Sequence, residues 1–173
     1  NGIVENVPGL ARRERAQPEQ VELAGFVRHF AEEHRNSHPL NDDQLDATAP
    51  AGTIAAMVDR RQLQQVLTAL VHNALVYGRM PGEPARVGIR AYADEQGNPT
   101  LDVTDRGPGI PDSVAEQLFR PFFTTSGEGT GLGLYIAREL CMANQASLQY
   151  VPVPAGGACF RIRLPGSRAI ATA

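Results

Sequence analysis

Apolar residues recur every three or four positions in three stretches of the chain, a spacing that predicts amphipathic helices. We expect these helices at residues 18–38, 60–77 and 132–144. The middle one has the clearest boundaries, because Asp59 can act as an N-cap and Gly78 allows the chain to leave the helix. The sequence therefore predicts three helices, each with one face turned towards a core.

Alternation of apolar and polar residues, with turn-forming residues between the runs, predicts short strands. The predicted strands cover residues 44–49, 53–58, 86–93, 100–104 and 158–164. Because strands and helices are interspersed, we expect an α+β fold, a two-layer sandwich with the sheet on one side and the helices on the other. A length of 173 residues is enough for one such domain.

The composition excludes several classes of protein. The chain has 16 arginines and no lysine, so it offers neither a P-loop lysine nor a lysine amine for pyridoxal chemistry. Its net charge of −3 gives no general attraction to nucleic acid, which is not expected as a partner. Cys141 and Cys159 lie in apolar segments and are expected to be buried thiols in a reducing compartment, which makes a cytoplasmic location the expectation.

An asparagine at the edge of an apolar helix face is the first candidate site residue. Asn73 shares a helical row with Val66, Leu70 and Tyr77, so its amide is expected beside buried side chains. Such an amide needs partners, and local backbone groups could supply them. Alternatively its oxygen is a ligand of Mg²⁺, a cation that takes few protein oxygens and keeps phosphate and water ligands.

A carboxylate followed by glycines is the second candidate. Asp105 comes directly after the predicted strand at 100–104, and Gly107 and Gly109 follow it. Glycine backbone leaves room for a flat ligand beside the carboxylate. The amine of adenine can donate to that carboxylate, whereas the carbonyl oxygen of guanine would leave it unpaired. An ordinary Asx turn uses the same residue types, so the pattern alone leaves both readings open.

A glycine-rich segment at residues 127–133 opens the third predicted helix and is the third candidate. Backbone N–H groups at a helix N-terminus form an anion site that needs no lysine. The segment is not a dinucleotide-binding fingerprint, because no buried strand immediately precedes it and no acidic residue follows at the required distance. Residues 111–131 could form a mobile lid over a bound ligand.

Together with residues 118–125, these clusters resemble the four nucleotide-binding boxes of the sensor histidine kinases. The N box resembles residues 65–78, the G1 box 105–110, the F box 119–125 and the G2 box 129–134. The resemblance covers residues 20–165 and implies the Bergerat ATP-binding fold, with a mixed, mostly antiparallel sheet of about five strands covered on one face by about three helices. Residues 121–125 and 156–162 are also similar to the kinases partnered with NtrC-like regulators, of the nitrogen and type IV pilus types.

The resemblance implies ATP and Mg²⁺ as cofactors and a role for each matching residue. It implies Asn73 as the metal ligand, Asp105 on the adenine amine and Tyr77 near the nucleotide. It also implies nucleotide contacts for Gly107, Gly109, Ile110, Arg120, Thr125, Gly129, Thr130, Gly131, Leu132 and Gly133. Arg120 is our candidate for neutralising phosphate charge. The implied activity is transfer of the γ-phosphate to a histidine outside this chain, for relay to a response-regulator aspartate.

Two positions depart from the family's pattern. Four residues before Asn73, where the hydrolases carry a glutamate and many kinases an asparagine, this chain has Ala69, which cannot activate water. Three residues after Asn73, where a phosphate-binding lysine is often found, it has Val76. The alternative function is therefore a catalytically degenerate module that senses nucleotide or binds a partner. A hydrolase is disfavoured by Ala69, and a serine kinase of the anti-sigma type by the helical pattern of residues 3–15.

No histidine of the chain matches the family's phosphoacceptor pattern. His34 and the following Pro39-Leu40 imitate it, but Arg35 replaces the acidic residue and the spacing differs. We interpret His29, His34 and His38 as surface residues and not as a metal cluster, because no cysteine joins them.

The resemblance also divides the chain. Residues 1–17 are expected to be the end of a dimerisation helix or a linker, residues 18–165 the ATP-binding domain and residues 166–173 a disordered tail. We expect this fragment to be monomeric and to act on its own dimerisation and phosphoacceptor domain. The full-length kinase is expected to be a homodimer anchored in the inner membrane, with this domain in the cytoplasm.

Overall fold

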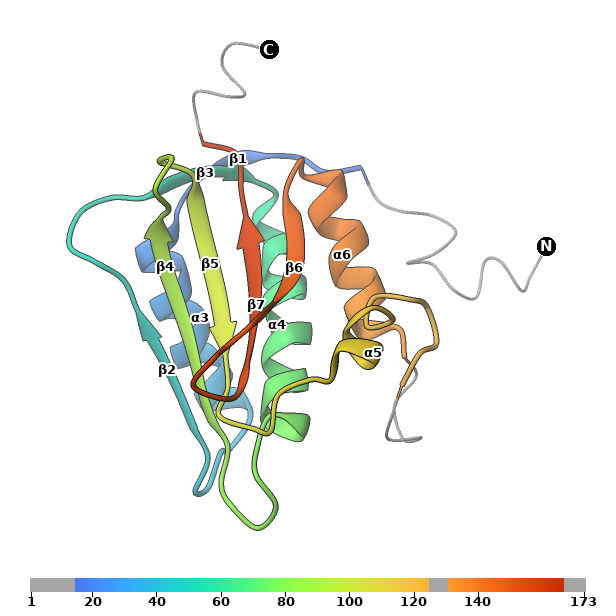
Figure 1. Ribbon diagram of the computed structural model, residues 1–173. Helices are drawn as coiled ribbons and strands as arrows, with labels where there is room; N and C mark the ends of the chain where they lie inside the picture. The colour runs from blue at the N-terminus through green and yellow to red at the C-terminus, as the bar shows by residue number, and fades with distance from the viewer. Residues whose placement is uncertain (1–14, 125–130, 167–173) are drawn as a thin grey trace.

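Five strands form one sheet, and three helices cover one of its faces within the described residues (Figure 1). This computed structural model describes residues 15–124 and 131–166. The order across the sheet is β2 (Gln44–Thr48), β4 (Arg86–Ala93), β5 (Pro99–Thr104), β7 (Ala158–Arg163) and β6 (Ser147–Pro152). Strands β2 and β4 are parallel and the other neighbours antiparallel. The expected fold class, a mixed and mostly antiparallel sheet under helices, is confirmed.

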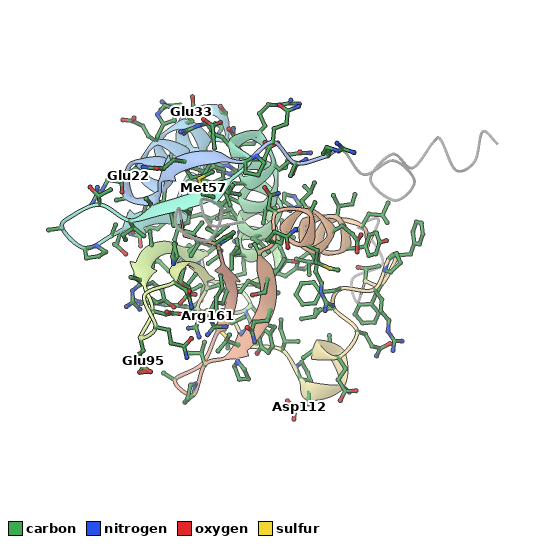
Figure 2. The ribbon with its side chains drawn as sticks, turned by 90° about the horizontal axis from the view of Figure 1, so that it is seen from above. Glu22, Glu33, Met57, Glu95, Asp112 and Arg161 are labelled. Carbon is green, nitrogen blue, oxygen red and sulfur yellow. The ribbon has the colours of Figure 1, made fainter. Side chains whose placement is uncertain are left out.

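Helix α3 (Leu23–Ser37) begins later than the sequence predicted. The carboxylate of Glu22, its N-cap, accepts hydrogen bonds from the N–H groups at positions 24 and 25. The residues before it form β1 (Glu19–Glu22), which pairs antiparallel with β3 (Ala55–Val58) in a separate two-stranded sheet, where Figure 2 labels Glu22 and Met57. The predicted start at residue 18 is wrong because a strand partner far along the chain competes with the helix.

The predicted strand at residues 53–58 is present as β3, but it does not belong to the five-stranded sheet. The missing fifth strand is β6, which the pattern analysis did not predict. This edge strand pairs with β7, and buried Leu148 lies between exposed Ser147 and Gln149. A short strand that ends at a proline gives a weak alternation signal, and its position in the sheet depends on β7.

Helix α4 (Arg60–Tyr77) lies in the middle of the helical layer, between α3 and α6 (Gly133–Ala143) (Figure 1). Its predicted N-cap is confirmed, since the Asp59 carboxylate accepts a hydrogen bond from the N–H of Gln62. Buried Asn144, which follows α6, accepts from the N–H of Asp59 and donates to the Gln62 side chain. The end of α6 is thereby fixed to the start of α4.

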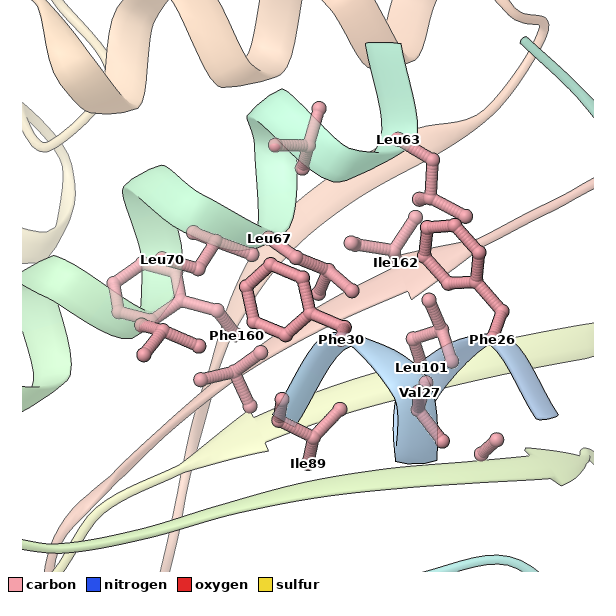
Figure 3. Packing of buried hydrophobic residues seen from close by; sticks show 14 of the residues in the cluster. Phe26, Val27, Phe30, Leu63, Leu67, Leu70, Ile89, Leu101, Phe160 and Ile162 are labelled. Atoms are coloured by element: carbon pink, nitrogen blue, oxygen red, sulfur yellow. The ribbon is translucent and has the colours of Figure 1, made fainter. Parts of the chain in front are cut away.

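The hydrophobic core lies between the helices and the sheet (Figure 3). Its members include Phe26, Val27, Phe30, Leu63, Leu67, Leu70, Ile89, Leu101, Phe160 and Ile162. Cys141 and Cys159 are buried free thiols, as expected, and burial raises the pKa of Cys141 to about 12. His34, expected at the surface, is instead buried, because its ring stacks between Phe30 and His38. The described residues contain no His, Cys, Asp and Glu group able to hold a metal.

An ion pair between buried Asp102 and half-buried Arg161 joins three strands on the sheet face away from the helices, where Figure 2 labels Arg161. Arg161 donates to both oxygens of Asp102, at 2.9 and 3.1 Å, and the hydroxyl of Tyr92 donates to Asp102 at 2.9 Å. The carboxylate holds the pKa of Arg161 above its usual range. These contacts link β4, β5 and β7 next to the point where β5 ends.

Most of both chain ends lies outside the described residues. Residues 1–14 and 167–173 contain the larger part of the expected dimerisation-helix end and of the expected tail. Gly166 pairs with Ala56 in an isolated β-bridge. In the part of the chain that the structure describes, no helix has the length and apolar character needed to span a bilayer.

Candidate functional site

Asp105 stands directly after the last residue of β5. Its Oδ1 atom accepts hydrogen bonds from the N–H groups of Gly107, at 2.9 Å, and Ala158, at 3.0 Å. Its Oδ2 atom has no hydrogen-bond partner among the described residues. Burial raises the pKa of Asp105, and the two backbone hydrogen bonds oppose this rise. One carboxylate oxygen is therefore fixed by the protein, and the other remains an acceptor.

Helix α4 ends against this carboxylate. A Cβ atom added to Gly78 would lie 2.3 Å from Oδ2 of Asp105. A Cβ atom added to buried Gly107 would lie 2.6 Å from the carbonyl carbon of Gly78. Because both distances are far below a van der Waals contact, the end of α4 and the Asp105 loop can approach this closely only through glycine. The N box and the G1 box of the sequence are thus adjacent in space.

The rest of the G1 segment offers backbone and one apolar side chain beside the carboxylate. Gly109 has a φ of +83°, a left-handed conformation that glycine adopts without strain. Ile110 is half-buried and packs against the hydrophobic core. An open loop with a fixed acceptor and an apolar neighbour suits a flat ring that carries a hydrogen-bond donor.

Asn73 and Tyr77 lie on the last turns of α4, which lead to Gly78. Asn73 is half-buried, and its amide makes no hydrogen bond within the described residues. Among the described residues, local backbone groups therefore do not satisfy this amide. Tyr77 is 43% exposed and directly precedes Gly78. The amide and the phenol are thereby at the same end of α4 as Asp105.

The described part of the glycine-rich segment is attached to the F box. The carbonyl of Gly131 accepts a hydrogen bond from the N–H of Phe122 at 2.7 Å, and a Cβ atom on Gly131 would lie 2.3 Å from the carbonyl carbon of Phe122. Helix α6 begins at Gly133, after Leu132, and none of the described side chains caps it. Uncapped N–H groups at a helix start can bind an anion. Thr125, Gly129 and Thr130 lie outside the described residues.

Arg120 is not brought to the other site residues by any described contact. It follows the short helix α5 (Asp112–Ala115), is exposed, and its side chain forms no hydrogen bond or ion pair within the described residues. The neighbouring Phe119 ring is covered by Arg138 of α6, whose guanidinium carbon lies 5.3 Å from the ring centroid. A phosphate-neutralising role for Arg120 stays a prediction.

A groove of about 1350 Å³ borders the site along α4, α6 and the end of α3. Ala69 and Val76, the two departures from the family's pattern, line it together with Gly133 and Ile136 of α6. Neither Asn73 nor Asp105 lines this groove, so it adjoins the carboxylate site and does not contain it. Ala69 and Val76 give the groove neither a base nor a positive charge.

Three residues next to Asp105 were not among the predicted site residues. Gly78 was predicted as a helix stop and as the last residue of the N box, but not as a contact of Asp105. Gly157 lies in the turn between β6 and β7, and Ala158, the first residue of β7, is 53 positions away from Asp105. The pair Gly156-Gly157 signals a tight turn, but no sequence pattern shows which loop that turn packs against.

Replacing Gly78 with alanine is expected to weaken binding of an adenine nucleotide about tenfold, if Asp105 is its acceptor, because the new methyl group must displace Oδ2. Calorimetric titration with ADP measures this. Gly166→Ala is the matched control, since its Cβ atom would meet its nearest neighbour at an ordinary 3.9 Å. A folded Gly78→Ala protein with unchanged ADP affinity would exclude Asp105 as the acceptor.

Comparison with known proteins gives the site its context. The model of the family "Histidine kinase-, DNA gyrase B-, and HSP90-like ATPase" matches residues 58–168, which include α4, Asp105 and α6. The sensor protein kinase PilS of Pseudomonas aeruginosa is 42% identical over 163 residues, 94% of this chain and 31% of PilS. The histidine kinase AtoS of Escherichia coli is 36% identical over 107 residues, 62% of this chain and 17% of AtoS.

Solved structures agree with these relatives. The nucleotide-free catalytic domain of histidine kinase ThkA superposes with a TM-score of 0.74 at 25% identity, covering 87% of this chain and 96% of that domain. The chain therefore spans less than a third of PilS but nearly the whole of an isolated catalytic domain. It belongs to the family of histidine kinase-, DNA gyrase B- and HSP90-like ATPases and is an ATP-binding domain of the histidine kinase type.

Proposed function

We propose that this domain binds Mg-ATP and transfers the γ-phosphate to a histidine on a dimerisation domain outside the chain. The observation that carries the proposal is the half-buried Asp105 carboxylate, with one oxygen held by two backbone N–H groups and the other without a hydrogen-bond partner in the described part of the chain. A carboxylate held in this way accepts a hydrogen bond from the adenine amine and rejects a purine with a carbonyl oxygen at that position.

The remaining roles follow from the surroundings of Asp105. Gly107, Gly109 and Ile110 would face the adenine ring, and Tyr77 would lie beside the nucleotide. The glycine-rich segment from Gly129 to Gly133, the residue at which α6 begins, would hold phosphate oxygens through its N–H groups. Arg120 and Thr125 would complete the phosphate side, where Val76 replaces the lysine often found in the family.

Magnesium fits the donor set of α4. Asn73 offers one amide oxygen that accepts no hydrogen bond from residues 15–124 or 131–166, and Mg²⁺ takes few protein ligands when phosphates and waters supply the others. Bound there, the ion would neutralise charge on the β- and γ-phosphates. Asn73 would fix its position, while the α6 N–H groups orient the phosphates towards the incoming histidine.

The nucleophile in this proposal is a histidine nitrogen and not water. Phosphoryl transfer depends mainly on positioning and on electrostatic stabilisation, which backbone amides and an amide ligand can provide. Ala69 stands where a base would have to activate water, so ATP hydrolysis of the gyrase type is not part of the proposed activity. The relatives named as sensor kinases support transfer to a histidine.

The partners and the location are proposed from the resemblance to sensor histidine kinases. We expect relay of the phosphoryl group to a response-regulator aspartate, and the similarity of residues 121–125 and 156–162 to kinases of NtrC-like regulators favours a regulator of that group. The full-length protein would be a homodimer anchored in the inner membrane, with this domain as a monomeric unit in the cytoplasm. Residues 1–17 would then connect to the dimerisation helix.

One observation favours a second function. Ala69 and Val76 place neither a base nor a cation at the two positions of α4 where the family often carries them, as in a domain that binds nucleotide without catalysis. Such a degenerate module would sense nucleotide or bind a partner, and it would share the adenine site.

The decisive experiment adds the phosphoacceptor domain of the same protein to this chain with Mg-ATP labelled at the γ-phosphate. We expect acid-labile phosphate on the acceptor histidine and calorimetric binding of ADP to the chain. Binding without transfer would select the degenerate module. A folded chain that binds no adenine nucleotide at millimolar concentration would refute both functions.

A further inference from the structure

The turn between β6 and β7 packs directly on the backbone of Asp105. Gly157 in this turn is buried and has a φ of +87°, and a Cβ atom added to it would lie 2.1 Å from the carbonyl oxygen of Asp105. Gly156 has an equally left-handed φ of +107°, but a Cβ atom on it would meet nothing within 4 Å. Both glycines allow the left-handed backbone of the turn, but only at Gly157 does the missing side chain leave room for the backbone of Asp105.

The next residue, Ala158, holds Asp105 by two hydrogen bonds. The N–H of Asp105 donates to the carbonyl of Ala158 at 3.0 Å, and the N–H of Ala158 donates to Oδ1 of Asp105 at 3.0 Å. Its partner on β6 is Pro152, which has no N–H group. A single residue of β7 therefore fixes both the backbone and one carboxylate oxygen of Asp105.

Further contacts between β5 and β7 support this attachment. Thr104 pairs with Cys159, and Asp102 pairs with Arg161 in the register between β5 and β7. The ion pair of Asp102 and half-buried Arg161 joins the same two strands at 2.9 Å. The hairpin turn is thus attached to strands that side chains also hold together, and no described contact makes it part of the nucleotide site itself.

We infer that the β6–β7 turn positions the Asp105 carboxylate, and that Gly157 and Ala158 thereby set the selectivity for adenine over a purine with a carbonyl oxygen in place of the amine. The inference rests on the proposed function and adds to it two positioning residues. With Oδ1 held by Ala158 and Gly107, the carboxylate cannot rotate, and Oδ2 keeps one direction. Selectivity follows, because a hydrogen-bond acceptor discriminates between donor and acceptor ligands only when it is fixed.

The test compares Gly157→Ala with Gly156→Ala. Each variant puts a Cβ atom on a left-handed residue of the same turn, but only Gly157→Ala pushes on Asp105. Calorimetry with ADP and with inosine diphosphate, which carries the carbonyl oxygen, gives the affinity ratio. For Gly157→Ala we expect ADP affinity to fall about ten- to a hundredfold and the ratio to fall with it. Gly156→Ala should stay within about twofold of the unchanged chain in both quantities.

A second variant decides the question if Gly157→Ala does not fold. Ala158→Pro removes the N–H that holds Oδ1, at the first position of a strand, where proline is tolerated. We expect the same loss of selectivity. If a folded variant of either kind keeps the ratio while Asp105→Asn loses it, the positioning role is refuted and the adenine site stands. If Asp105→Asn also keeps the ratio, the proposed adenine site itself is refuted.

Discussion

Replacing Asp105 with asparagine is expected to weaken ADP binding about ten- to a hundredfold, the effect of losing a hydrogen bond to a charged group. Because the N–H groups of Gly107 and Ala158 both point at Oδ1, the asparagine must place its carbonyl oxygen there. Its NH₂ group then takes the place of Oδ2 and faces another donor, the adenine amine. Calorimetric titration of both proteins with ADP measures the difference.

The control for this prediction is Asp46→Asn, which makes the same change of charge at an exposed position of β2. Burial raises the pKa of Asp105 in the folded protein. The protonated carboxyl therefore stabilises the fold at low pH, and this stabilisation is lost as pH rises through the folded-state pKa. At neutral pH the ionised carboxylate opposes folding. The Asp105→Asn protein should therefore unfold at no lower temperature than the unchanged chain. Equal ADP affinities would contradict the adenine assignment.

Replacing Asn73 with alanine is expected to lower phosphoryl transfer about a hundredfold or more while leaving adenosine binding nearly unchanged. The amide oxygen of Asn73 has no hydrogen-bond partner among the residues that the structure describes, and its loss would leave Mg²⁺ without its ligand from α4. A hundredfold lower rate corresponds to about 2.7 kcal/mol of lost transition-state stabilisation. Transfer to the phosphoacceptor domain and calorimetry with adenosine give the two quantities.

The matched control for Asn73 is Asn36→Ala, which makes the same change at an exposed position of helix α3. It should change neither transfer nor binding. If Asn73→Ala lowers adenosine binding as much as transfer, Asn73 supports the structure of the site and is not a metal ligand. Magnesium titration at fixed ATP then provides an independent check, because a lost ligand raises the magnesium concentration needed for half-maximal transfer.

Local sequence patterns predicted correctly an element whose ends are marked by a capping residue and a helix-terminating residue. Helix α4 has an apolar stripe, an aspartate N-cap and a glycine stop, and its predicted bounds are confirmed. The start of α3 was wrong, because residues 19–22 pair with β3, a partner more than thirty positions away. Strand β6 was not predicted, since its alternation is short and its place at the sheet edge depends on β7.

The candidate site also contains residues that the sequence could identify and contacts that it could not. Asn73, Asp105 and the glycines after Asp105 could be named from residue type and order, because each carries a donor, an acceptor or backbone freedom suited to a nucleotide. Their roles stay predictions. The contacts of Gly78 and Gly157 with Asp105 could not be named, since a glycine's sequence neighbours do not show what its missing side chain makes room for.

The sequence by itself determined the kind of chemistry available here: no lysine for phosphate, an amide on a helix, a carboxylate after a strand and glycines at a helix start. Tertiary structure alone decided which carboxylate oxygen is fixed and which is open. That choice depends on Ala158, which reaches Asp105 only because β5 and β7 pair side by side. Hydrogen bonds between distant strands follow from packing of the whole sheet, and no local pattern encodes their direction.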